Sequence, residues 1–175
     1  MSLAGMSLAG MSLAAADLGV PTVAAVAAVL VAIAGAVATT TDGWYRGLRV
    51  PAWKPPDWAF GPVWTVIFAL TATSGVLAWT GDPDRIARGV LLAAFAVNGV
   101  LNIAWSVLFF RFRRPDWALA EVAALWLSIV ALVLVTGRVS GAAALMNLPY
   151  LAWVSTAACL NLRIVRLNAP FGEPA

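Results

Sequence analysis

Five apolar stretches, each about as long as a bilayer-spanning helix, constrain this chain more than any other feature. A hydrocarbon core of about 30 Å requires about 20 consecutive apolar residues in a helix. The sequence meets that length five times, approximately over residues 20–40, 60–80, 86–110, 117–136 and 142–162. We therefore expect an all-α fold, a polytopic membrane protein whose five transmembrane helices form one bundle.

The composition supports a membrane location and narrows the chemistry. Of the 175 residues 62% are hydrophobic and 11% charged, whereas soluble domains carry about 25% charged residues. Only Glu121 places a carboxylate clearly inside a predicted helix, and few intramembrane charges argue against pumps and voltage sensors. With no His and a single Cys159, we expect no metal site and no catalytic dyad.

The chain divides into three parts by composition. We expect an N-terminal tail over residues 1–17, a five-helix domain over 18–167 and a C-terminal tail over 168–175. The first tail repeats MSLAG, so that translation could begin at Met1, Met6 or Met11. The repeat is too short to be a structural one.

The basic residues predict how the chain is oriented. An odd number of spans places the termini on opposite sides, and more Lys and Arg lie in the loops on the C-terminal side than on the N-terminal side. Because cytoplasmic loops carry the excess of Lys and Arg, we expect the C-terminus and residues 41–59 in the cytoplasm. The charge of +3 lies in loops, so we expect no nucleic acid partner. The pattern does not distinguish an inner from an outer membrane.

The lid loop, as we name residues 41–59, is unusually rich in Trp and Pro. A Trp ring has to be buried while its N–H finds a partner, and Pro fixes the backbone. We expect Trp44 and Trp58 to anchor the loop at the membrane interface, while Trp53 reaches over a ligand pocket. The loop residues assigned to this site are Trp44, Tyr45, Pro51, Trp53, Pro55 and Pro56.

Large and polar side chains also fall on single faces of the predicted helices, read at 100° per residue. These faces carry Phe60, Trp64 and Phe68 in the second helix, Asn98, Asn102 and Trp105 in the third, and Trp153, Ala157, Leu160 and Asn161 in the fifth. A buried amide needs partners. Two explanations for Asn98 and Asn102 stay open: hydrogen bonds between helices, or polar contacts to a ligand in a Trp-lined cavity.

Two further patterns have mainly structural explanations. Glu121 lies in the first turns of the fourth helix, where the helix dipole favours a carboxylate, so we expect capping or pairing with a nearby Arg. Ala24, Ala28, Ala32 and Ala36 form a stripe of small residues in the first helix. Such a stripe permits either close packing within one bundle or a homodimer contact.

Several ordered motifs carry a resemblance to a known family. They are WY at Trp44, PAWKPP at residues 51–56, VW at Val63, LN and W over residues 101–105, WAL at Trp117, and PYLAW at residues 149–153 followed by LN at Leu160. From about Asp42 onward the chain resembles the TspO/MBR family of tryptophan-rich sensory proteins and translocator proteins, once called peripheral benzodiazepine receptors. The resemblance implies a five-helix bundle, usually a homodimer, whose cavity is closed by the loop after the first helix.

The resemblance also implies ligands, and the chain departs from the family's common residues at three positions. Porphyrins such as protoporphyrin IX are the implied ligands, with cholesterol or other sterols and benzodiazepine-type drugs in some members, and no cofactor is required. The lining it carries over consists of Trp53, Trp64, Phe68, Asn98, Asn102, Trp105, Trp153, Ala157 and Leu160. Asn98 stands where Gln is common, Glu121 where Asp is common and Phe68 where Tyr is common, so ligand selectivity transfers less well than membership.

Three classes of function follow. A tetrapyrrole-binding sensor or receptor is favoured, because it needs a cavity and no catalytic group. A transporter of porphyrin or a sterol-like lipid is the alternative, although coupling charges and an inverted repeat are missing from the sequence. Light- or oxygen-dependent porphyrin degradation is a second alternative, in which a cavity Trp is redox-active.

Overall fold

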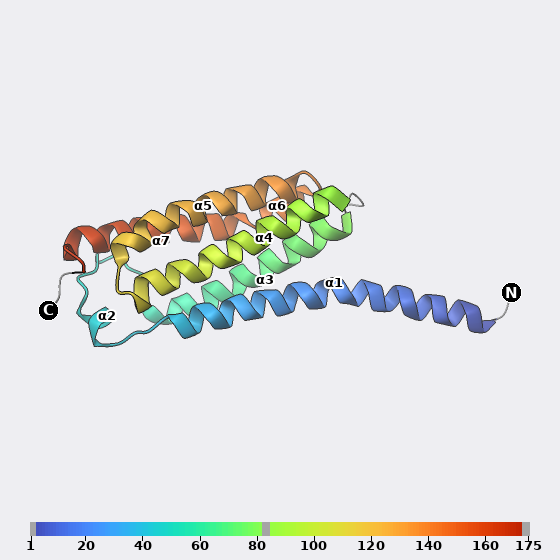
Figure 1. Ribbon diagram of the computed structural model, residues 1–175, viewed down its shortest axis with the longest axis horizontal. Coiled ribbons are helices and arrows are strands. Elements are labelled where there is room, and N and C mark those ends of the chain that lie inside the picture. Colours follow the sequence, from blue (N-terminus) through green and yellow to red (C-terminus); the bar gives the residue numbers. More distant parts are fainter. Residues whose placement is uncertain (1–2, 82–84, 173–175) are drawn as a thin grey trace.

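The chain folds into a bundle of long helices (Figure 1). The computed structural model describes residues 3–81 and 85–172, with side chains from Gly19 onward except those of residues 85 and 86. Met1 and residues 173–175, the end of the expected C-terminal tail, lie outside this part. The elements are α1 (Leu3–Ala38), α2 (Gly43–Gly47), α3 (Asp57–Gly81), α4 (Arg85–Ser106), the π-helix η1 (Val107–Arg111), α5 (Pro115–Gly137), α6 (Gly141–Leu145) and α7 (Leu148–Asn168).

Five helical stretches in the described chain are long and apolar enough to cross a membrane. They are Gly19–Ala38, Asp57–Gly81, Ala87–Arg111, Pro115–Gly137 and Gly141–Asn168. The predicted all-α fold with five spans is thereby confirmed. The backbone of α1 is already helical at Leu3, within the expected N-terminal tail, and α2 is an additional helix inside the lid loop.

Helix α5 packs against α3, α4, α6 and α7. Helix α1 packs against α3 and α4. The buried positions of α5 recur every three or four residues: Pro115, Ala118, Val122, Leu125, Ile129, Leu132 and Thr136. In α1, by contrast, only Ala38 among the described side chains is buried. Helix α1 is therefore the peripheral helix, and it extends beyond the bundle at its N-terminal end (Figure 1).

Two glycines permit close helix contacts. A Cβ atom on Gly99 would lie 3.2 Å from Cγ2 of Val31, so α1 and α4 approach closely there. A Cβ atom on Gly75 would lie 3.2 Å from the Phe95 ring, where α3 meets α4. In a bilayer, packing of this kind replaces the hydrophobic drive that joins helices in water.

A buried polar cluster joins the helices at the end opposite α2. The Asn147 Nδ2 group donates to Ser74 Oγ at 2.7 Å and to the Ala143 carbonyl at 3.1 Å. Ser74 Oγ in turn donates to the same carbonyl at 2.7 Å. Because hydrocarbon offers no water to these groups, the cluster holds α3, α6 and α7 in one register.

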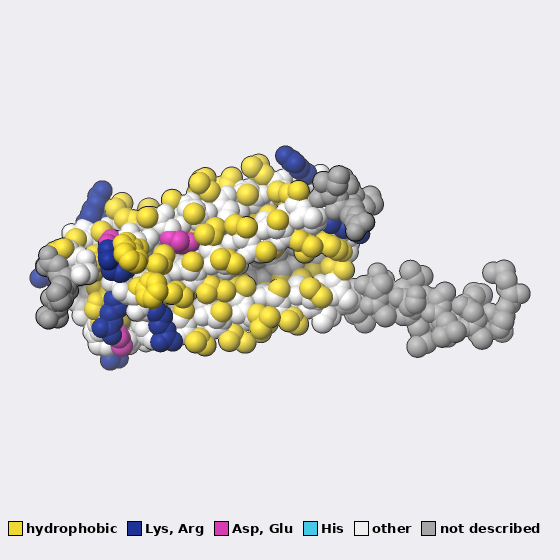
Figure 2. Space-filling view, viewed as in Figure 1, with side chains coloured by type: hydrophobic (Ala, Val, Ile, Leu, Met, Phe, Trp, Pro, Cys, Tyr) yellow, Lys and Arg dark blue, Asp and Glu magenta, His cyan; other side chains and the backbone are white. Residues whose placement is uncertain are grey.

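The surface agrees with a bilayer environment. Figure 2 shows hydrophobic side chains over the middle of the bundle, while most Lys and Arg side chains gather near its ends. Large apolar side chains on the outside of α1, such as Val23 at 69% and Leu30 at 61% exposure, would face lipid. The chain is accordingly an integral, multi-pass membrane protein.

Candidate functional site: a cavity below the lid loop

A cavity of about 1160 Å³ lies among α1, α3, α4, η1 and α7. Its α1 wall includes the small residues of the alanine stripe, Ala24, Ala28, Ala32 and Ala36. Tyr45 and Asp57 line it at the lid-loop end. The stripe that could have packed against another helix thus forms one side of a cavity.

Aromatic side chains form the opposite wall near the lid loop. They are Phe60, Trp64 and Phe68 from α3, Trp105 from α4, Phe110 from η1 and Trp153 from α7. The Trp64 and Phe68 rings stack with centroids 5.3 Å apart, and Phe60 meets Trp153 edge-on at 5.5 Å. These contacts hold the rings in place, so the wall is shaped before any ligand arrives.

The π-helix η1 orients part of this wall. The N–H of Phe112 donates to the Val107 carbonyl at 3.0 Å. This bond closes the wider turn that is typical of a π-helix, and such turns often occur at functional sites. In this turn the Phe109 ring stacks on the Trp105 ring, with ring centroids 5.2 Å apart. It also contacts the Trp44 ring, with centroids 6.2 Å apart. Trp44, expected as an interface anchor, is half-buried in this cluster and does not line the cavity.

The two asparagines have partners on other helices. Asn98 Nδ2 donates to Ser128 Oγ of α5 at 2.8 Å, and Asn102 Nδ2 donates to the Tyr150 hydroxyl of α7 at 2.9 Å. Asn102 also lines the cavity, whereas Asn98 does not. The indole N–H of Trp105 is buried and has no partner among the described residues.

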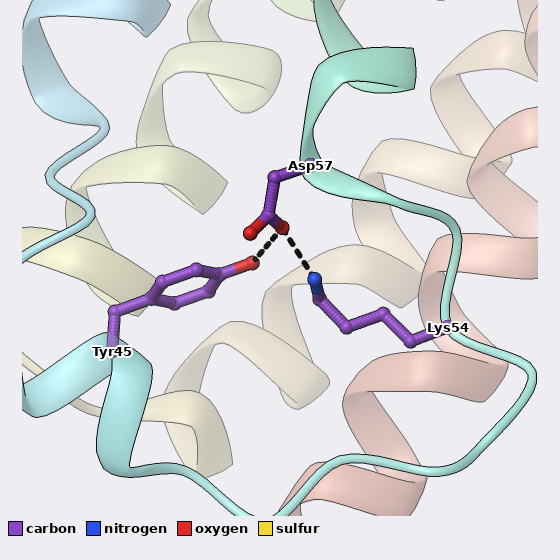
Figure 3. A network of polar contacts seen from close by, with 3 residues as sticks. All are labelled: Tyr45, Lys54 and Asp57. Carbon is purple, nitrogen blue, oxygen red and sulfur yellow. Dashed lines mark hydrogen bonds and ion pairs between the residues drawn. The ribbon is translucent and has the colours of Figure 1, made fainter.

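A polar network closes the lid-loop end of the cavity. The Tyr45 hydroxyl donates to Asp57 Oδ1 at 3.0 Å, and the Lys54 ammonium donates to the same oxygen (Figure 3). Lys54 also lies 5.6 Å from the Tyr45 ring centroid and 5.9 Å from that of Phe60. The network ties α2, the following loop and the start of α3 together at the mouth.

The network changes the acid–base properties of its loop members. Burial raises the pKa of Tyr45 above its ordinary value, and the hydrogen bond to Asp57 adds to this. Burial alone lowers the pKa of Lys54, but its contacts with Asp57 and Tyr45 outweigh that effect, so the pKa is raised. Lys54 therefore stays charged at the mouth at neutral pH.

Trp53 does not occupy the place that the sequence analysis assigned to it. The Lys54 N–H bonds to the Pro51 carbonyl at 3.0 Å, which makes residues 51–54 a tight turn. Trp53 lies at the tip of the turn, is 49% exposed and does not line the cavity. Pro51, Pro55 and Pro56 are also outside the lining, and Trp58 is 76% exposed.

The end of the predicted fifth-helix face is buried away from the cavity. Leu160 packs with Phe109, Ala118 and Ile164. Asn161 is 1% exposed; with its amide oriented to satisfy both neighbours, it donates to the Pro115 carbonyl and accepts from the Leu119 N–H. The structure thus brings Phe60, Trp64, Phe68, Asn102, Trp105, Trp153 and Ala157 together at the cavity, with Tyr45 at the mouth.

Sequence reasoning missed several contributors. Tyr150, 1% exposed, lies one helical turn before Trp153 and receives the Asn102 bond, a position that the helical period could have identified. Phe110 of η1 also lines the cavity and was not assigned to the site from the sequence. Glu121 forms no ion pair with Arg114, which instead pairs with Asp116, and neither Glu121 carboxylate oxygen has a partner in the described chain.

Comparison with known proteins gives a consistent match. The sequence model of the TspO/MBR family matches residues 22–167. Tryptophan-rich protein TspO of Chlorobaculum tepidum is 42% identical over 127 residues, covering 71% of this chain and 79% of that protein. Tryptophan-rich sensory protein of Cereibacter sphaeroides is 33% identical, covering 78% and 87%. The Homo sapiens translocator protein is 32% identical, covering 71% and 75%.

Proposed function

This chain belongs to the TspO/MBR family, and on that basis we propose that it is a membrane sensor or receptor that binds a tetrapyrrole such as protoporphyrin IX. The ligand would occupy the aromatic section of the cavity, between Trp64, Trp105 and Trp153. Binding is the proposed activity, and the cavity wall carries no catalytic group that the proposal uses.

The aromatic wall is the observation that carries this proposal. Six aromatic side chains from four elements line one section of the cavity. A flat macrocycle offers two large apolar faces, and aromatic rings pack well against such faces in offset or edge-on geometry.

The charges at the mouth suit the polar edge of a porphyrin. Propionate groups are anionic at neutral pH and favour cationic partners. Lys54 at the mouth already pairs with Asp57, and Arg46 is exposed on α2, next to the cavity-lining Tyr45. The propionates would therefore point toward the lid loop while the macrocycle lies among the Trp rings.

The test is a titration of the purified protein with protoporphyrin IX, followed by Trp fluorescence. We expect saturable quenching, and we expect Trp153→Ala to weaken affinity by about fivefold to tenfold, because an aromatic contact contributes about 1 kcal/mol. Trp58→Ala is the matched control, since Trp58 is 76% exposed and outside the cavity. Equal affinity of Trp153→Ala and the wild type would refute the site.

The same preparation separates sensor, transporter and enzyme. Saturable binding with an unchanged absorbance spectrum in light and darkness supports the sensor. Accumulation of protoporphyrin IX inside sealed proteoliposomes would instead establish transport, and loss of its absorbance in light would establish degradation.

A further inference from the structure

The cavity continues well beyond its aromatic section. Along α1 its lining runs from Pro21 to Ala36, about 22 Å at 1.5 Å per residue, which is most of the hydrocarbon thickness of a bilayer. We name the part away from the lid loop the aliphatic section. It is lined by Pro21, Ala24, Ala25, Ala28 and Val29 of α1 and by Ala69, Ala72, Thr73 and Val76 of α3.

One compact ligand does not account for the whole cavity. Its volume of about 1160 Å³ exceeds the roughly 300–1,000 Å³ of ordinary small-molecule sites. A ring system held between Trp64 and Trp153 lies at the lid-loop end. The aliphatic section then remains unoccupied over about 12 Å of α1, from Pro21 to Val29.

The two sections differ in the chemistry that they offer. The aromatic section carries the Asn102 amide and three indole rings beside its Phe rings. In the aliphatic section the Thr73 hydroxyl donates to the Ala69 carbonyl of its own helix at 2.8 Å, and none of its other side chains has a polar atom. The aliphatic section is thus matched to a group without hydrogen-bonding atoms, that is, to a hydrocarbon chain.

The aliphatic section is also open to the bilayer. Val29 is 54% exposed, and Ala25, Ala69 and Thr73 at its edges are exposed as well. These residues belong to stretches that span the membrane, so the medium at their depth is lipid hydrocarbon. A chain could enter sideways, between α1 and α3, without leaving that medium.

We propose that the aliphatic section is a binding site for one acyl chain of a membrane phospholipid, held alongside the ligand in the aromatic section. The small, apolar side chains of α1 and α3 leave room there for an extended hydrocarbon chain. The site goes beyond the tetrapyrrole proposal and does not depend on it.

The test uses the full-length protein, exchanged into detergent with added phosphatidylcholine and measured by native mass spectrometry. Ala28→Phe and Ala72→Phe fill the section from opposite walls, so that one variant still reports if the other fails to fold. Leu30→Phe and Val66→Phe add the same ring to the outer faces of α1 and α3, where these residues are 61% and 57% exposed and outside the lining. Wild type and both outer variants should retain a bound phosphatidylcholine that Ala28→Phe and Ala72→Phe lose.

Protoporphyrin IX affinity supplies the second measurement. Ala28→Phe and Ala72→Phe should still bind protoporphyrin IX saturably, which shows that they are folded, and saturating protoporphyrin IX should leave the lipid bound to the wild type. Three results would overturn the proposal. They are equal lipid retention in all variants, equal loss of lipid in the outer variants, and displacement of the lipid by protoporphyrin IX. If protoporphyrin IX fails to bind the wild type while the lipid pattern holds, only the proposed function fails.

Discussion

At the scale of single residues, amides and hydroxyls inside the bundle connect the cavity wall to the helices behind it. Asn102 lines the cavity and donates to the Tyr150 hydroxyl, and Asn98 donates to Ser128. Contacts of this kind between membrane helices contribute about 0.6 to 2 kcal/mol. The sequence left helix contact and ligand contact open for these two amides, and the structure shows the helix contacts.

Tyr150→Phe tests this arrangement. The change keeps the ring and removes the hydroxyl that accepts from the Asn102 amide, so the free energy of unfolding should fall by about 1 kcal/mol. The measurement is unfolding in mixed micelles of rising denaturing-detergent content. The double variant with Asn102→Leu should cost less than the sum of the single changes, because the pair is lost only once. Strict additivity would show that the bond does not contribute.

Trp53 shows why single side chains are harder to predict than faces. A helical period fixes which positions share a face, and Trp64, Trp105 and Trp153 do line one cavity. In the lid loop no period applies, and the turn at residues 51–54 decides which side chain points inward. That turn directs Lys54 toward the Tyr45 and Phe60 rings and leaves Trp53 at the surface.

At the scale of elements, the long helices follow from the sequence and the short ones do not. Five apolar stretches of about 20 residues admit only spanning helices. Helix α2 has five residues, too few to show a period, and it depends on its cap. Asp42 accepts from the Tyr45 N–H at 3.1 Å and pairs with Arg113 at 2.8 Å.

The cap makes α2 sensitive to acid. The Tyr45 N–H bond lowers the pKa of Asp42 below its ordinary value of 3.8, against a smaller opposing effect of desolvation, and Arg113 lowers it further. A lowered folded pKa means that the cap stabilises α2 fully above that ordinary value and is lost as the pH falls through the folded pKa. Amide exchange protection over Gly43–Gly47 should therefore be constant near neutrality and decrease as the pH falls below 3.8.

Asp42→Asn is the matched control for this effect. Asn also caps helices but does not titrate, so protection over α2 should lose most of its acid dependence. Asp42→Ala should lower the protection at every pH. An unchanged acid dependence in Asp42→Asn would assign the effect to another group.

At the scale of the whole molecule, a peripheral helix, the helix bundle and the lid loop together surround the cavity. Helix α1 contributes only Ala38 to the buried residues of the described chain, yet its small residues form one side of the cavity. The cavity therefore depends on how α1 rests against α3 and α4, which length and composition do not reveal. The cytoplasmic placement of the lid loop remains a prediction from the charge pattern.

The most direct test of the tetrapyrrole site compares two neighbouring positions of α7. Ala157 lines the cavity, whereas Thr156 is exposed on the outside of the same helix. Ala157→Phe and Thr156→Phe introduce the same ring one residue apart, and protoporphyrin IX affinity is measured for both. We predict that Ala157→Phe lowers the affinity tenfold or more, about 1.4 kcal/mol, and that Thr156→Phe leaves the affinity unchanged. Equal affinities would contradict it.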